Sequence, residues 1–136
     1  MAHNEKLSVL VDTNILFSAL LNPDGVVAKA AMHVADNAKL VLCEQNVQEL
    51  LSIVSRKLPN RTAAAKEMLR DLNYELIPMV PYSGPAKIRD RTDQPILDAA
   101  IAYGVDIILT GDRDFLSLEL SKPRCMSPSD YLEKMK

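Results

Sequence analysis

Short apolar runs alternate along the chain with segments in which apolar residues recur at helical spacing. The runs at residues 7–11, 39–43 and 106–110 have the length and the β-branched content of strands buried on both faces of a sheet. Residues 26–37 and 62–72 carry apolar side chains three and four positions apart, which predicts amphipathic helices. The chain therefore begins as a strand-helix alternation.

The same alternation continues to the end of the chain. The remaining predicted elements are a helix capped by Asn14 and ending at Leu21, a helix through residues 47–54, a strand at 74–80, a helix at 95–103, a strand near 125–126 and a helix ending at Lys134. This order predicts one α/β domain over residues 1–136, with a parallel sheet of about five strands covered on both faces. Ligands bind beyond the carboxyl ends of the strands in such sheets.

Composition is that of an ordinary globular domain. Of the 136 residues, 48% are hydrophobic and 25% are charged, and the net charge is −2. Any contact with nucleic acid must therefore come from local basic patches, and an aromatic content of 4% argues against base-stacking platforms. Cys43 and Cys125 form no CxxC pair, and the longest apolar run is short, so we expect a reducing cytoplasm and no membrane segment.

Several common active-site motifs are missing. The sequence contains no GxxxxGK[ST], GxGxxG or HExxH pattern. Both histidines lie in the first third of the chain, and His33 falls off the apolar stripe of its helix, where a solvent-facing or structural side chain is expected. Serine and cysteine nucleophiles therefore lack a plausible general base. The carboxylates remain as candidates.

Two carboxylates directly follow predicted strands. Asp12 follows LSVLV, and Asp112 follows DIILTG. Either residue alone is explained by a turn, but two carboxylates at one sheet edge repel each other unless a cation lies between them. Oxygen ligands favour Mg²⁺ or Mn²⁺ over zinc. The pair therefore indicates a divalent-metal site at this edge.

Periodicity alone gives three other acids no role in this site. Asp93 precedes a predicted helix, where a carboxylate can cap free amides. Asp98 lies off the apolar stripe of the same helix, and Glu49 lies about 200° around its helix from Val47. Helical geometry therefore predicts that Asp98 and Glu49 face solvent.

Three segments, in order, resemble motifs of the PIN-domain family. They are VDTNILFSALL, LCEQNVQELLSIVSRK and TDQPILDAAIAYGVDIILTGDRDFLSL. The closing MSPSDYLEK is similar to the last strand and helix of the family, so the resemblance runs nearly from end to end. It is strongest to the small stand-alone prokaryotic members of the VapC toxin type. The resemblance implies a PIN-like three-layer α/β/α fold and metal-dependent hydrolysis of RNA phosphodiester bonds.

The resemblance also assigns roles to individual residues. The four principal acidic positions, implied to be catalytic and to hold Mg²⁺ or Mn²⁺, are Asp12, Glu49, Asp93 and Asp112, with Asp114 as an auxiliary metal ligand. The positions implied to orient the carboxylates or to lie just behind them are Thr13, Asn14, Asp98 and Thr110. Since the family leans this helix over the acidic pocket, the resemblance overrides the solvent-facing prediction for Glu49.

An RNA substrate must approach this acidic pocket through basic residues. Arg91 and Arg113 are the predicted nucleic-acid contacts, because each lies within two residues of an implied metal ligand. Other basic residues of the same segments are Arg56, Lys57, Arg61, Lys87 and Arg89. Family resemblance further implies an antitoxin protein as partner and a homodimer.

Two other classes of function compete with a ribonuclease: a non-catalytic scaffold and an Asp-based phosphotransfer domain, either a phosphatase or a receiver. A non-catalytic PIN scaffold would bind RNA or a partner protein without cutting, and the intact acids argue against it. An Asp-based phosphatase would need an acid two residues after Asp12, where Asn14 stands. A phosphoacceptor receiver domain would need an aspartate at the end of its middle strand, and KLVLCEQ has none. A ribonuclease is therefore the favoured function.

Overall fold

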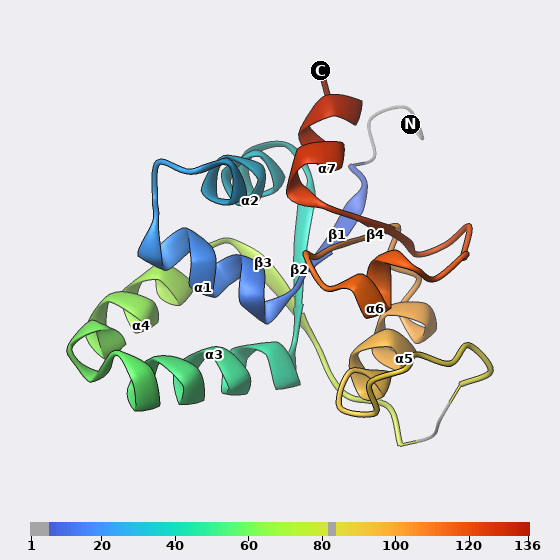
Figure 1. The fold of residues 1–136 in the computed structure, drawn as a ribbon, viewed down its shortest axis with the longest axis horizontal. Helices are drawn as coiled ribbons and strands as arrows, with labels where there is room; N and C mark the ends of the chain where they lie inside the picture. Colours follow the sequence, from blue (N-terminus) through green and yellow to red (C-terminus); the bar gives the residue numbers. More distant parts are fainter. Residues whose placement is uncertain (1–5, 82–83) are drawn as a thin grey trace.

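Five parallel strands form one sheet in the computed structural model, which describes residues 6–81 and 84–136 (Figure 1). The strands are β1 (Ser8–Val11), β2 (Lys39–Cys43), β3 (Tyr74–Ile77), β4 (Ile107–Leu109) and β5 (Arg124–Met126). They lie in the order β3-β2-β1-β4-β5, and every neighbouring pair is parallel. The predicted α/β class with a five-stranded parallel sheet is confirmed.

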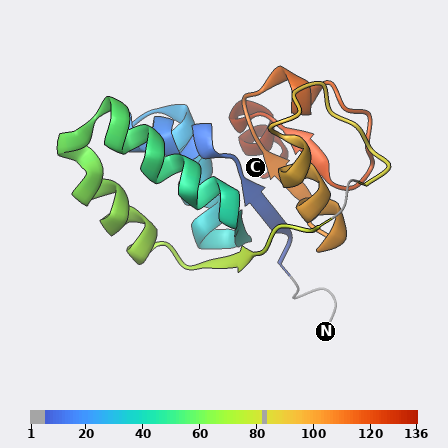
Figure 2. The ribbon, with the colours of Figure 1, turned by 90° about the horizontal axis from the view of Figure 1, so that it is seen from below.

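Helices cover both faces of this sheet. They are α1 (Thr13–Leu21), α2 (Val26–Asn37), α3 (Glu44–Lys57), α4 (Thr62–Asp71), α5 (Gln94–Ala102), α6 (Arg113–Leu116) and α7 (Pro128–Lys134), with a short 3₁₀ turn at Pro59–Arg61. Figure 1 shows α1 to α4 on one side of the strands and α5 and α6 on the other. In Figure 2, α3 and α4 run side by side and extend away from the sheet.

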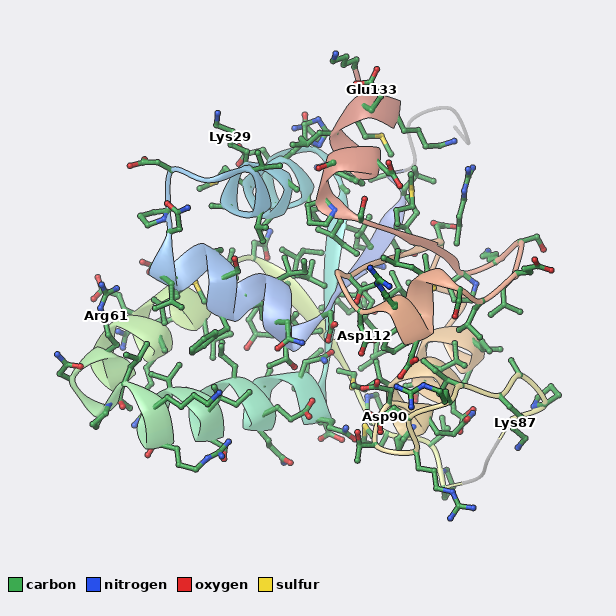
Figure 3. All side chains as sticks on the ribbon, in the orientation of Figure 1. Lys29, Arg61, Lys87, Asp90, Asp112 and Glu133 are labelled. Atoms are coloured by element: carbon green, nitrogen blue, oxygen red, sulfur yellow. The ribbon has the colours of Figure 1, made fainter. Side chains whose placement is uncertain are left out.

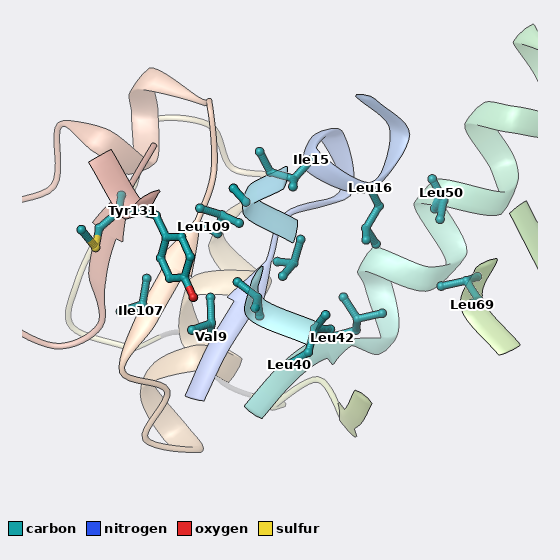
Figure 4. Packing of buried hydrophobic residues seen from close by; sticks show 14 of the residues in the cluster. Val9, Ile15, Leu16, Leu40, Leu42, Leu50, Leu69, Ile107, Leu109 and Tyr131 are labelled. Carbon is teal, nitrogen blue, oxygen red and sulfur yellow. The ribbon is translucent and has the colours of Figure 1, made fainter. Parts of the chain in front are cut away.

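The three central strands, β2, β1 and β4, bury alternate side chains in two separate cores. Val9 and Val11 of β1 point into the core beneath α1 to α4 and α7, which also holds Leu50 and Tyr131 (Figure 4). Leu10, between them, packs into the second core beneath α5 and α6. Each fully buried aliphatic side chain contributes roughly 1.5–3 kcal/mol relative to its exposed state. Burial on both faces explains why the strands are continuous apolar runs.

Some predicted boundaries were wrong. Helix α1 begins at Thr13 with Asp12 at its N-cap, so the cap predicted for Asn14 was wrong. Strand β3 ends at Ile77 and not at residue 80, because Pro78 has no N–H to donate to a neighbouring strand. Helix α6 was not predicted, because a helix of four residues is too short to show apolar periodicity. The remaining elements lie within two or three residues of their predicted positions.

The histidine and the cysteines of the described chain have structural environments. His33 is half-buried, and its Nδ1 lies 2.9 Å from the hydroxyl of Tyr131, which links α2 to α7. Cys43 is buried and Cys125 is half-buried, and both are free thiols. The structural interpretation of His33 is confirmed. Cys43 lies in the core that also holds Leu10, and Cys125 packs against that core, so both thiols act as small apolar side chains.

Within the described ranges no single helix is long and apolar enough to cross a membrane, although α1 and α2, bent by 115° where they meet, pass that test as a pair on length and composition alone.

The connections change direction between β1 and β4. From β1 the chain builds β2 and β3 on one side, and it then crosses to β4 and β5 on the other. Register pairs Val11 with Leu109, and the N–H of Asp12 donates to the carbonyl of Leu109 at 3.0 Å. The residues that leave β1 and β4 are therefore neighbours at the point where ligands bind in open parallel sheets.

Candidate functional site

Asp12 is the most buried acid at this point of the sheet. It is 6% exposed, and Thr110 donates a hydrogen bond from Oγ1 to its Oδ2 at 2.8 Å. Burial raises the pKa of Asp12 above its usual value. Hydrogen bonds from Thr110 and from the backbone of Thr13 oppose this rise, while the carboxylates of Asp112 and Glu49 add to it. The side chain is fixed in place, and its charge calls for a cation.

A second set of hydrogen bonds holds Glu49 beside Asp12. Oγ1 of Thr13 lies 3.3 Å from Oε1 of Glu49 and accepts a hydrogen bond from Nδ2 of Asn46 at 3.2 Å. Asn46 is fully buried, and its Oδ1 accepts from the N–H of Cys43, so it also caps the start of α3. Glu49 itself is half-buried. The solvent-facing prediction from the helical period was therefore wrong for Glu49, because α1 packs against this part of α3.

Asp112 follows β4 and begins α6. Its Oδ1 accepts from the N–H of Asp114 at 2.9 Å, which is an N-cap hydrogen bond. Its own N–H donates to Oγ1 of Thr110 at 3.0 Å. The buried hydroxyl of Thr110 therefore connects Asp12 to Asp112, which supports the orienting role implied for it.

Asp93 occupies the N-cap position of α5 without capping the helix. Its side chain makes no cap hydrogen bond, so the capping explanation for this residue is wrong. Within residues 6–81 and 84–136, its Oδ2 is the buried side-chain oxygen or nitrogen atom that lacks a hydrogen-bond partner. Burial raises the pKa of Asp93 to about 7, and the carboxylates of Asp112, Asp90 and Asp12 contribute to the rise.

Two further carboxylates crowd Asp93. Oxygen atoms of Asp90, Asp93 and Asp114 all lie within 4.8 Å of one another. Arg89 offsets part of this charge, since its Nε and Nη2 donate to the two carboxylate oxygens of Asp114 at 2.8 and 3.0 Å. The carboxylates of Asp90 and Asp112 both raise the pKa of Asp93, and Figure 3 shows the two residues on the same side of the molecule. One cluster therefore joins the acids of the loop before α5 to those after β4.

Asp98 lies in a different environment from the one predicted. It is 5% exposed, so the expectation of a solvent-facing side chain was wrong. Its Oδ1 accepts hydrogen bonds from the N–H of Gly84 at 3.0 Å and from Nε2 of Gln94 at 2.9 Å. The loop before α5 folds over this face of the helix, which a helical wheel cannot show. Asp98 therefore holds that loop.

The remaining predicted residues are exposed. Asn14 lies on the first turn of α1, and Arg113 is the first residue of α6, directly after Asp112. Arg91 lines a groove of about 770 Å³ beside α5, together with Lys87 and Arg89. Arg56 lines a smaller hollow of about 340 Å³ next to Glu49. Basic side chains thus flank the acids on two sides.

Asn46 and Asp90 were not among the predicted site residues, and Arg89 was named only as one of several nearby basic residues. Asn46 stands at the third position of α3, where a capping-box residue is expected, but the unusual N-cap Cys43 weakens that signal. Asp90 and Arg89 lie in a loop without periodicity, and only the fold brings them to Asp114. Sequence reasoning can place strand ends, whereas the path of such a loop depends on tertiary contacts.

The donor set fits a hard divalent cation. All converging side chains offer carboxylate or hydroxyl oxygens, which Mg²⁺ and Mn²⁺ prefer. Like charges at this spacing are costly unless a cation or a proton lies among them. The partnerless Oδ2 of Asp93 is an available ligand atom. Arg89 is a partial counter-ion only, because its contacts are with Asp114.

Together the fold and the cluster define an α/β protein with a carboxylate site where the strand order changes direction. The chain belongs to the PIN-domain family, whose model matches residues 8–114. That range contains β1 to β4 and all the acids of the cluster. No curated protein matches the sequence.

Solved structures of low sequence identity share the fold. A chain of VapBC2 from Rickettsia felis, crystallised with a DNA fragment from its promoter, is 17% identical, with a TM-score of 0.71 over 89% of this chain and 98% of that chain. A chain of DNA-bound VapBC from Salmonella typhimurium is also 17% identical, with a TM-score of 0.62 over 90% of this chain and 98% of that chain. These likenesses confirm the PIN-like three-layer α/β/α fold.

Proposed function

We propose that the protein is a metal-dependent endoribonuclease that hydrolyses RNA phosphodiester bonds at the acidic cluster. The residues proposed to hold Mg²⁺ or Mn²⁺ are Asp12, Glu49, Asp93, Asp112 and Asp114. Membership of the PIN-domain family supports a nuclease, since its members are nucleases in general. The observation that carries the proposal is the buried, partnerless Oδ2 of Asp93 among like charges.

Each side chain has a distinct part in this proposal. When bound, Mg²⁺ or Mn²⁺ would neutralise the carboxylates, make water a nucleophile at neutral pH and stabilise charge on the phosphate. Thr110 keeps one oxygen of Asp12 oriented, and Thr13 does the same for Glu49. The helix-capping bond from Asp114 fixes Asp112. The proposal requires no histidine as a general base, because a bound metal ion would itself lower the pKa of the water.

We further propose that the protein is the toxin of a toxin–antitoxin pair. The support is the fold shared with chains of two VapBC complexes. Its partners would then be RNA as substrate and an antitoxin protein in the cytoplasm, with a homodimer as the expected assembly. Expression in a bacterial host is expected to arrest growth, and Asp12→Asn to relieve the arrest.

Cleavage of a fluorogenic single-stranded RNA with Mn²⁺ tests the nuclease proposal. Three proteins are purified in parallel: the wild type, Asp12→Asn, and the control Asp36→Asn, whose residue is exposed on α2. We expect the wild type and the control to cut alike. Asp12→Asn should lose at least about 100-fold in rate. Loss of a residue that only supports a metal ligand costs about 10- to 100-fold, and Asp12 is proposed to be a ligand itself.

Contaminating ribonucleases would be present equally in all three preparations. Equal rates from the three proteins, or rates that persist in a chelator, would contradict the nuclease proposal. RNA binding without any cleavage by the wild type would instead favour the non-catalytic scaffold.

A further inference from the structure

A groove of about 770 Å³ lies between α5 and the loop that precedes it. Three of its lining residues, Lys87, Arg89 and Arg91, are basic, and Ile88 and Pro95 give it apolar surface. None of the described residues that line it is aromatic. We call it the arginine groove. It adjoins the acidic cluster, because Arg89 contacts both the groove and Asp114.

Hydrogen bonds connect the backbone of the loop to side chains of α5. Nε2 of Gln94 donates to the carbonyl of Ala86 at 2.8 Å, and its Oε1 accepts from the N–H of Ile88 at 3.1 Å. Oδ1 of Asp98 accepts from the N–H of Gly84. Gln94 and Asp98 thus pair with backbone N–H and C=O groups of the loop. The basic side chains remain on the open side, since Arg89 and Arg91 are exposed.

Arg89 is suited to bind a second partner. Its side chain is 84% exposed. It donates hydrogen bonds to both carboxylate oxygens of Asp114, whose side chain is 14% exposed. A guanidinium binds phosphate with the same two-pronged geometry. The guanidinium of Arg89 is exposed to water, so a phosphate can approach it and compete with Asp114 for the same donors. Asp114 would then be free to act beside Asp93.

We propose that the arginine groove binds the phosphodiester backbone of single-stranded RNA next to the acidic cluster, and that Arg89 exchanges Asp114 for a backbone phosphate. Arg91 contacts the neighbouring phosphate. This inference rests on the proposed nuclease function. Guanidinium contacts to phosphate position the strand and carry no sequence information, so we expect this binding to be tolerant of base sequence.

Binding measured without cleavage tests the groove separately from the nuclease. A labelled single-stranded oligoribonucleotide is titrated with protein in EDTA, and anisotropy gives Kd at several salt concentrations. The groove variant is Arg89→Ala with Arg91→Ala. Its control is Lys66→Ala with Arg70→Ala, which removes the same charge from exposed positions of α4, at the far end of the molecule in Figure 1.

We expect the groove variant to bind at least about tenfold more weakly, with a salt slope reduced by about 1.4, because each lost phosphate contact on a single strand contributes about 0.7. The control should bind like the wild type, and oligonucleotides of scrambled sequence should bind alike. Thermal melts of both double variants verify folding.

The outcomes separate the two proposals. No RNA binding by the wild type, or the same affinity and slope in both double variants, would overturn the groove. Groove-dependent binding by a wild type that shows no Mn²⁺-dependent cleavage would support the groove and overturn the nuclease. Equal Mn²⁺-dependent cleavage by both double variants would support the nuclease and overturn the groove.

Discussion

The acidic cluster has two halves that differ in how their oxygens are satisfied. In the first half, Asp12 and Glu49 accept hydrogen bonds from the hydroxyls of Thr110 and Thr13. In the second half, the carboxylates of Asp90, Asp93 and Asp114 crowd together, and one oxygen of Asp93 has no partner among the described residues. The first half therefore has hydrogen-bond donors within the protein. In the second half, a cation or a proton would offset the like charges.

The difference follows from the elements that carry each half. The residues of the first half leave β1 and β4 or lie on α3, all of which pack into the two cores. Asp90 lies in the loop before α5, and Asp114 lies on α6, a helix of four residues. We therefore expect the first half to hold its carboxylates more rigidly than the loop-borne second half.

Removal of the shared hydroxyl should have the largest effect. Thr110→Val keeps the shape of the buried side chain but leaves Oδ2 of Asp12 and the N–H of Asp112 without partners. We expect a loss of about 1–3 kcal/mol in the free energy of unfolding. Mn²⁺ affinity should fall about 10- to 100-fold. Urea denaturation measures the free energy of unfolding, and calorimetry measures Mn²⁺ affinity. Thr110→Ser, which keeps the hydroxyl, should restore both quantities. Unchanged Mn²⁺ affinity in Thr110→Val would contradict the orienting role.

Asn46→Ala should cost less, because it removes support from Glu49 only indirectly. The change leaves the N–H of Cys43 and Oγ1 of Thr13 without their amide partner. We expect the free energy of unfolding to fall by about 1–2 kcal/mol in urea denaturation. The control Asn37→Ala, at an exposed position of α2, should change it by less than about 0.5 kcal/mol. Equal effects of the two changes would deny Asn46 its structural role.

The smallest effect is expected from Asp93→Asn in a chelator. The folded-state pKa of about 7 lies above the ordinary value, so ionisation disfavours the folded protein. Stability from this residue is complete at low pH and is lost as the pH rises through 7. Solvent screens a half-buried group, which keeps the change modest. In thermal melts, the stability of Asp93→Asn relative to wild type should therefore rise between pH 5 and pH 8, whereas that of Asp36→Asn should not. A difference in stability between Asp93→Asn and wild type that stays constant with pH would contradict this.

The strand ends were the predictable part of the molecule. Apolar runs buried on both faces identified β1, β2 and β4, and the parallel sheet then brought Asp12 and Asp112 to one edge. Periodicity also located α2 and α4. The ends of the elements were less predictable, because single residues set them. Pro78 ends β3, and Asp12 is the N-cap of α1.

The loop before α5 could not be predicted. Its residues have no periodicity, and its path depends on hydrogen bonds between its backbone and the side chains of Gln94 and Asp98. For this reason helical geometry predicted an exposed Asp98. Asp90 went unnoticed, and Arg89 was named only as one of several basic residues. Family resemblance supplied Glu49 and Asp93, which the residue pattern alone left without a role. The roles of the acids in catalysis stay predictions.

Calorimetric titration of Mn²⁺ at pH 8 tests most directly whether Asp93 completes a divalent-cation site. The proteins compared are the wild type, Asp93→Asn and Asp36→Asn, in the absence of RNA. If the partnerless oxygen is a ligand atom, the wild type and Asp36→Asn bind Mn²⁺ with the same affinity, and Asp93→Asn loses at least about tenfold. Identical affinities for all three proteins, or no binding by the wild type, would contradict the site.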